Sequence, residues 1–163
     1  MPTSEVVIAD SSPFVHLDRI GRLDLLPAVF ARVTVPETVV AEVGRGGARY
    51  PGIDLRGLSW VHVHPDRADA DLAADPALHA GEVSALSIAR ATPGHLLVID
   101  DLGGRSAAQR LGLRFIGTAG TVVRARKAGL IPSAAAVLDA LAARGFRLSV
   151  EVRRLLLDQV GEA

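Results

Sequence analysis

Short apolar runs alternate along the chain with longer stretches in which apolar residues recur at helical spacing. Four of the five runs are followed directly by Asp or Pro, residues that typically end a strand. The run at 96–99, Leu-Leu-Val-Ile, is apolar throughout, which is typical of a central parallel strand with both faces buried. The predicted strands cover residues 6–9, 33–35, 60–64, 96–99 and 115–118.

The segments between these strands predict helices. Asp10-Ser-Ser-Pro is typical of a helix start, since Ser and Asp cap free N–H groups and Pro suits the first turn. Strands that alternate with helices indicate a three-layer α/β/α sandwich with a mostly parallel central sheet. No repeat or linker divides the chain, so one domain over residues 1–163 is expected. The predicted helices cover 14–20, a second short helix between Gly21 and residue 26, and the ranges 37–43, 79–90, 106–111, 119–128, 133–144 and 150–160. Residues 44–57 and 66–75 are expected to be connections.

Composition excludes several classes of protein. The chain has 163 residues, 49% of them hydrophobic, which suffices for a core without staples. It has no cysteine, so disulfides, a thiolate nucleophile and sulfur-based metal sites are ruled out. Neither a secretory signal nor an apolar run of the ~20 residues that span a membrane is present, and a cytoplasmic protein without membrane contact is expected.

The formal net charge is zero, yet the two signs are unevenly distributed. Residues 1–101 contain 14 acidic and 8 basic side chains, and residues 102–163 contain 4 acidic and 10 basic ones. Such a split fits an acidic pocket beside a basic surface, and equally fits a chance distribution over solvated helices.

The acidic residues at strand ends suggest a site. Asp10 and the pair Asp100-Asp101 directly follow apolar strands, whose carboxyl ends form the ligand-binding edge of an open parallel sheet. Glu42 and Glu82 lie in predicted helices whose apolar faces would turn toward that sheet. Converging carboxylates repel one another unless a cation joins them, and oxygen ligands suit Mg²⁺ or Mn²⁺. The chemistry that follows from such a site is metal-assisted hydrolysis of a phosphodiester.

Other candidate sites are weaker. His62 and His64 project from one face of a strand as a metal pair would, but no third ligand is near them in sequence. His79 lies three residues before Glu82 and suits either the acidic pocket or a capping role. The acidic segment 66–75 lacks the spacing of a calcium loop, and the glycines at 44–47 follow no strand, as a phosphate cradle would.

The ordered set of motifs resembles the PIN-domain proteins, and within them the VapC-like group of predicted nucleic-acid-binding proteins. The resemblance covers nearly the whole chain. It implies an α/β/α sandwich and a metal-dependent ribonuclease, often the toxin of a toxin–antitoxin pair and a homodimer. The motifs are Val-Val-Ile-Ala-Asp10-Ser-Ser-Pro, Ile20-Gly-Arg-Leu-Asp-Leu-Leu, Val35-Pro-Glu-Thr-Val-Val-Ala-Glu42, Gly81-Glu82, Leu97-Val-Ile-Asp-Asp101, Gly104-Arg105, Gly117-Thr118 and Arg124-Ala-Arg-Lys-Ala-Gly-Leu-Ile-Pro.

The resemblance assigns roles to individual residues. The four catalytic acids would be Asp10, Glu42, Glu82 and Asp101, with Mg²⁺ or Mn²⁺ bound by Asp10, Glu82 and Asp101. Asp100 is an alternative metal ligand. The chain departs from the family at Ser11, where Thr is usual, and at Glu82, where the toxins usually have Asp.

Basic and hydroxyl side chains complete the predicted site. Arg105 follows the acidic pair and is the best candidate for a contact with the RNA phosphate. Ser11 and Thr118 are candidates for supporting the same phosphate. Since 4% of residues are aromatic, base stacking is not expected to be a major source of affinity. The substrate is expected to be RNA, single-stranded or structured, and a separate antitoxin protein is a possible partner.

Two alternative functions keep the same acids. The first is a PIN-like module that binds nucleic acid or protein without cutting. The second is a haloacid-dehalogenase-type phosphatase with Asp10 as nucleophile, although such enzymes need a second acid where this chain has Ser12. Metal binding and cleavage distinguish a nuclease from a non-catalytic module.

Overall fold

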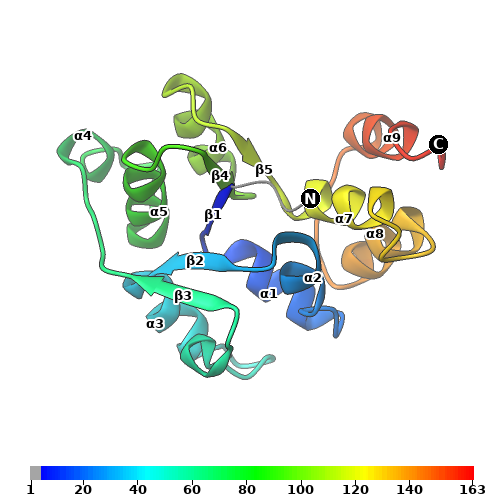
Figure 1. Cartoon of the computed structure of the whole chain (residues 1–163), viewed down its shortest axis with the longest axis horizontal. Helices are drawn as coiled ribbons and strands as arrows, with labels where there is room; N and C mark the ends of the chain where they lie inside the picture. The colour runs from blue at the N-terminus through cyan, green and yellow to red at the C-terminus, as the bar shows by residue number, and fades with distance from the viewer. Residues whose placement is uncertain (1–4) are drawn as a thin grey trace.

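The computed structural model describes residues 5–163. Its centre is a sheet of five strands in the order β3-β2-β1-β4-β5, and every neighbouring pair is parallel (Figure 1). All five predicted strands are confirmed, with ends shifted by up to two residues. Their bounds are β1 Val6–Ala9, β2 Val33–Pro36, β3 Val61–His64, β4 His95–Val98 and β5 Phe115–Ile116.

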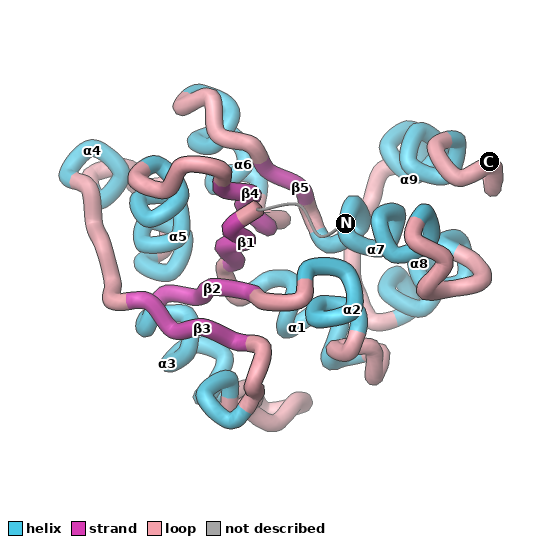
Figure 2. The backbone as a smooth tube through the Cα atoms, in the orientation of Figure 1, coloured by secondary structure: helices cyan, strands magenta, loops and turns pink. Residues whose placement is uncertain are grey.

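Helices cover both faces of this sheet (Figure 2). Val7 and Ala9 of β1 pack into one core with α1, α2, α7 and α8, whereas Ile8 between them packs into a second core with α5 and α6. The predicted α/β/α sandwich is therefore confirmed. The helices are α1 Ser12–Arg19, α2 Leu25–Phe30, α3 Glu37–Arg45, α4 Ala70–Ala73, α5 Ala80–Arg90, α6 Leu102–Arg110, α7 Thr118–Lys127, α8 Ala134–Ala143 and α9 Val150–Asp158, with a 3₁₀ turn at Leu55–Gly57.

Helix α6 begins four residues earlier than the sequence predicted. Asp101 is its N-cap, and the Asp101 carboxylate accepts a hydrogen bond of 3.0 Å from the Gly103 N–H. The two glycines that follow indicated a loop by propensity. Gly104 is instead needed by packing, because a Cβ there would overlap the Ile99 side chain. The acid at the carboxyl end of the sheet therefore starts the helix directly.

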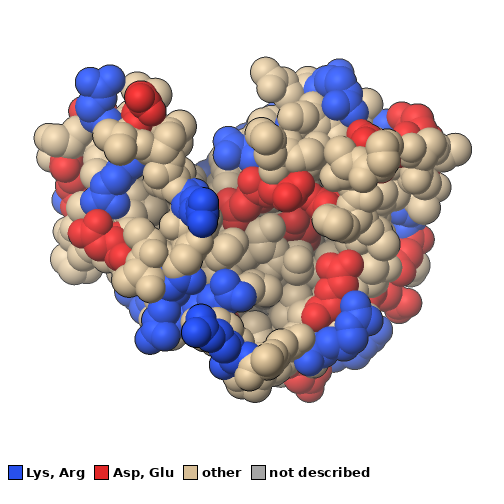
Figure 3. All heavy atoms as spheres, turned by 180° about the vertical axis from the view of Figure 1, so that it is seen from behind, with Lys and Arg blue, Asp and Glu red and all other residues tan. Residues whose placement is uncertain are grey.

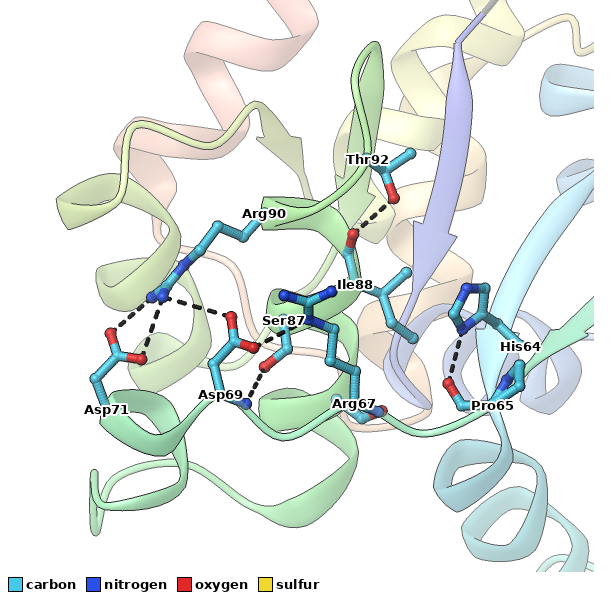
Figure 4. A network of polar contacts seen from close by, with 10 residues as sticks. His64, Pro65, Arg67, Asp69, Asp71, Ser87, Ile88, Arg90 and Thr92 are labelled. Carbon is cyan, nitrogen blue, oxygen red and sulfur yellow. Dashed lines mark hydrogen bonds and ion pairs between the residues drawn. The ribbon is translucent and has the colours of Figure 1, made fainter.

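The acidic connection between β3 and α5 is folded against α5 and contains the unpredicted short helix α4. The backbone N–H of Asp69 donates to the Ser87 hydroxyl at 3.0 Å, and Arg90 pairs with Asp71 at 2.7 Å (Figure 4). Arg67 pairs with Asp69 in the same network. Asp69 and Asp71 are therefore both paired with arginines. Within residues 5–163, no helix has the length and apolar character that crossing a bilayer requires.

Candidate active site

The sheet and three helices bring Asp10, Glu42, Glu82 and Asp101 to one cleft of about 320 Å³. Asp10 lies at the carboxyl end of β1, and the other three acids come from α3, α5 and the start of α6. On the face seen from behind, acidic side chains gather in a central hollow with Lys and Arg at its margins (Figure 3). Ser11, Ser12 and His79 complete the lining of the cleft.

Asp10 is held rigidly at the bottom of this cleft. It is 2% exposed, and both of its oxygens accept hydrogen bonds of 3.0 Å from Ser12, one from the backbone N–H and one from the hydroxyl. Burial raises the pKa of Asp10 to about 8, and the negative charges of Asp100 and Glu82 act in the same direction. The Ser12 hydrogen bonds oppose this shift. The carboxyl group is therefore poised to gain or lose its proton near neutral pH.

Glu82 has a similar environment at the first turn of α5. It is 5% exposed, and Oε1 accepts a hydrogen bond of 2.9 Å from the His79 N–H. The other oxygen, Oε2, is buried and has no hydrogen-bond partner among residues 5–163. Burial raises the pKa of Glu82 to about 7, and the adjacent Asp101 carboxylate adds to the shift. An unpartnered buried carboxylate oxygen is costly, so Oε2 is suited to a proton or a cation.

The Glu42 carboxylate packs closely on the start of α5 because residue 81 is glycine. A Cβ at Gly81 would lie 2.8 and 3.0 Å from the two carboxylate oxygens of Glu42. The motif Gly81-Glu82 therefore has two functions, since the glycine leaves room for Glu42 and the glutamate faces the cleft. Glu82 lies in the first turn of α5.

The side chains of Asp100 and Asp101 lie in different surroundings. Asp101 lines the cleft with Asp10 and Glu82, whereas Asp100 accepts hydrogen bonds from the Thr118 N–H at 2.7 Å and the Thr118 hydroxyl at 2.5 Å. Asp100 thereby ties β4 to the start of α7. Its charge still lies close enough to raise the pKa of Asp10. Of the two, only Asp101 is among the residues that line the cleft.

Three residues predicted to contact phosphate lie in different places. Ser11 lines the cleft. Arg105 is exposed beside it, in an adjacent hollow that also contains Asp100, with its guanidinium 5.5 Å from the centre of the Phe115 ring. Thr118 is fully buried and bonded to Asp100, so its hydroxyl cannot reach a phosphate in the cleft. Thr118 is instead a positioning residue for Asp100.

The sequence did not identify the residue that holds Asp10. The resemblance pointed to the hydroxyl of Ser11, but Ser12 makes both hydrogen bonds to the carboxylate. His79 is the N-cap of α5 and also lines the cleft, so the capping role and the pocket position predicted as alternatives occur together. His62 and His64 lie on β3, away from this cleft, and His64 Nδ1 lies 2.7 Å from the Pro65 carbonyl oxygen.

The carboxylate oxygens of the cleft are suitable ligands for a hard divalent cation, although they do not lie as close together as the ligands of a bound ion would. Within residues 5–163, no group of three or more His, Asp or Glu side chains is already placed to hold a metal ion. The fit rests on the chemistry of the donors. Carboxylate oxygens on four elements face one cleft, and Glu82 Oε2 has no other partner.

We predict that Thr118→Val moves Asp100 and weakens the fold. The substitution keeps the buried volume but removes the hydroxyl that donates to Asp100. The free energy of unfolding should fall by about 1–3 kcal/mol, the cost of leaving a buried partner unsatisfied. Urea denaturation measures the loss, and Thr118→Ser, which keeps the hydroxyl, is the control. A Val variant as stable as the Ser variant would show that this hydrogen bond contributes nothing.

A comparison with protein families agrees with this architecture. The sequence model of a family described as a PIN domain matches residues 6–162. The all-parallel sheet between helices, with acids at the carboxyl ends of β1 and β4, fits the nuclease-type α/β fold of PIN domains. The chain is a member of the PIN-domain family. Membership sets aside the phosphatase alternative. No curated protein matches the chain significantly.

Proposed function

We propose that the protein is a metal-dependent ribonuclease that hydrolyses phosphodiester bonds of RNA in the cleft around Asp10. The observation that carries this proposal is the pair of buried carboxyl groups, Asp10 and Glu82, at the base of an open acidic cleft in a PIN-domain chain. Buried acids without cationic partners destabilise a fold. Their retention in an open cleft fits a site that binds a cation and a substrate.

Asp10, Glu82 and Asp101 would hold one or two Mg²⁺ or Mn²⁺ ions, with Glu42 at the margin. A bound divalent ion lowers the pKa of water and stabilises the negative charge that develops on phosphate oxygens. Carboxylates and water suit these two ions better than softer metals. The chain offers no thiolate that would favour zinc.

Other steps of hydrolysis, the acceptance of a proton and the binding of phosphate, would be carried out by side chains in and beside the cleft. The water oxygen attacks phosphorus, the bond from phosphorus to the leaving ribose oxygen breaks, and the proton of the water must be accepted. Glu42, the acid of the cleft outside the proposed ligand set, would accept that proton, and the leaving ribose oxygen would take up a proton from solvent water. Arg105, exposed beside the cleft, would bind a phosphate of the strand. Ser11, at the N-cap of α1, would donate to the same region.

The test is cleavage of a mixed pool of single-stranded and structured RNA by the purified chain. Parallel reactions contain Mn²⁺, Mg²⁺ or a chelator, and Glu82→Gln is compared with the parent protein. We expect cutting that requires the ion and is lost in Glu82→Gln. Cutting that persists with chelator would refute the metal dependence. Metal binding without any cutting would favour the non-catalytic nucleic-acid-binding module.

The proposal includes a role as the toxin of a toxin–antitoxin pair, acting as a homodimer. Helix α9 supports a protein contact of this kind. Leu157 packs into the core and is 6% exposed, whereas Leu155 is 58% and Val150 81% exposed. An exposed apolar surface of this type fits a second protein chain. Sedimentation of the chain alone, compared with Leu155→Glu, tests the dimer. A parent chain that sediments as a monomer would remove it.

A further inference from the structure

A second and larger pocket, of about 520 Å³, adjoins the acidic cleft. Glu42 lines both cavities, so they are neighbours along α3. Three arginines from separate elements surround the second pocket, together with Tyr50, the only tyrosine of the chain. Arg19 comes from α1, Arg49 from the loop after α3, and Arg144 from the end of α8. The volume lies within the roughly 300–1,000 Å³ of small-molecule sites.

The loop that carries Tyr50 is folded back on α3 as a fixed wall. The Gly47 N–H donates to the Tyr50 carbonyl at 2.9 Å, and the Ile53 N–H donates to the Val43 carbonyl at 3.0 Å. Gly46 has a φ of +61°, and a Cβ at Gly52 would overlap the Gly44 carbonyl. The glycines therefore serve the close approach of the two ends of this loop, which sets the position of Tyr50.

The arginines of this pocket are not engaged by carboxylates. Among residues 5–163, Arg19, Arg49 and Arg144 form no ion pair, whereas most other arginines do. Arg19 Nε is buried without a hydrogen-bond partner, and its guanidinium lies 4.5 Å from the centre of the Tyr50 ring. Asp18 and Glu42 also line the pocket, so its charge is positive by one. A cationic pocket with a stacking surface has the chemistry of a nucleotide site.

We propose that this pocket binds one unpaired nucleotide of the RNA strand, adjacent to the phosphate that is cleaved. The base stacks on the surface formed by Tyr50 and Arg19, and Arg49 and Arg144 contact the flanking phosphates. This inference rests on the proposed function for its substrate and adds that the strand must be single-stranded at this point, because a base inside a duplex cannot enter a pocket. It also gives the RNA strand a path across the molecular surface, between the Tyr50 pocket and the acidic cleft.

Binding measured without cleavage tests the proposal. Fluorescence anisotropy follows a labelled 12-nucleotide single-stranded RNA on the full chain carrying Asp10→Asn, in the presence of chelator. We expect Tyr50→Ala to weaken binding about tenfold and Tyr50→Phe, which keeps the ring, to bind as the parent does. The double variant Arg49→Gln/Arg144→Gln should lower the slope of log affinity against log salt by about 0.7 for each lost phosphate contact.

A matched control separates a local effect from a general loss of charge. Arg32 is exposed at the amino end of β2, the opposite edge of the sheet, and Arg32→Gln should leave the affinity unchanged. Equal binding by the parent and Tyr50→Ala, or equal loss in Arg32→Gln, would overturn the pocket, as would an RNA that does not bind the parent. Cleavage by the wild-type chain together with unaltered binding in Tyr50→Ala refutes the pocket but leaves the nuclease. Pocket-dependent binding without cleavage in the wild-type chain supports the pocket and refutes the nuclease.

Discussion

Asp10→Asn should abolish RNA cleavage while making the folded chain more stable. We expect activity to fall by more than about a hundredfold, which exceeds the roughly 10–100-fold loss that is typical when only an outer partner of a metal ligand is changed. The fold should persist, because the amide has the shape of the carboxyl and can keep both contacts with Ser12. At pH 8 without cation the free energy of unfolding should rise by roughly 1 kcal/mol or more, since a buried charge is removed. Single-turnover cleavage and urea denaturation measure the two effects.

The control for Asp10→Asn is the same substitution at an exposed aspartate outside the cleft. Asp158→Asn, in the exposed last turn of α9, should change neither the cleavage rate nor the stability. An Asp10→Asn protein that still cuts RNA at the parental rate would remove Asp10 from the mechanism. Loss of stability in that variant would show instead that the ionised carboxylate holds the fold together.

Without a divalent ion, the chain should become less stable as the pH rises from about 4 to 8. The unfolded chain releases the protons of Asp10 and Glu82 near pH 4, whereas the folded chain retains them until about pH 8 and 7. The folded state therefore binds more protons in this range, and the free energy of unfolding falls as the pH rises. The total loss should amount to a few kcal/mol, since one pKa unit corresponds to about 1.4 kcal/mol.

Divalent ions should reverse this loss. Saturating Mn²⁺ or Mg²⁺ at pH 8 binds the folded state alone and raises the melting temperature, and chelator restores the low value. In the double variant Asp10→Asn/Glu82→Gln, both the pH dependence and the response to the ion should be nearly absent. Thermal unfolding at pH 5 and pH 8 measures both effects. A parent protein more stable at pH 8 than at pH 5 in chelator would show that the two acids are not buried as described.

Much of the fold could be predicted from hydrophobic patterning. The run at 96–99 identified β4, and the short runs at 6–9 and 33–35 identified the two strands beside it, because buried parallel strands contain few polar residues. The start of α6 could not be predicted in this way. Gly103 and Gly104 oppose helix formation, and they are explained only by packing, of Gly103 on the Ala77 carbonyl and of Gly104 on Ile99. Helix α4 was missed because its stability comes from contacts with α5 rather than from its own sequence.

The sequence predicted which acidic residues lie in the cleft, but not which residues hold them by hydrogen bonds. Strand ends placed Asp10 and Asp101 at one end of the sheet, the apolar faces of two predicted helices indicated Glu42 and Glu82, and the family resemblance named the same four acids. The choice between Asp100 and Asp101 required the hydrogen bonds from Thr118, which lie 18 residues away in sequence. The role of Ser12 required the geometry of the turn after β1. The pocket around Tyr50 depends on three elements that no local pattern connects.

The most direct test of the central claim, that the carboxylates of the cleft bind the cation on which RNA cleavage depends, is a Mn²⁺ titration at pH 8. The electron paramagnetic resonance signal of the free ion reports binding to the wild-type chain and to Asp10→Asn. We expect the wild-type chain to bind one or two ions and Asp10→Asn to bind at least about tenfold more weakly. A wild-type chain that cuts RNA without binding Mn²⁺, or equal binding by the two proteins, would contradict the claim.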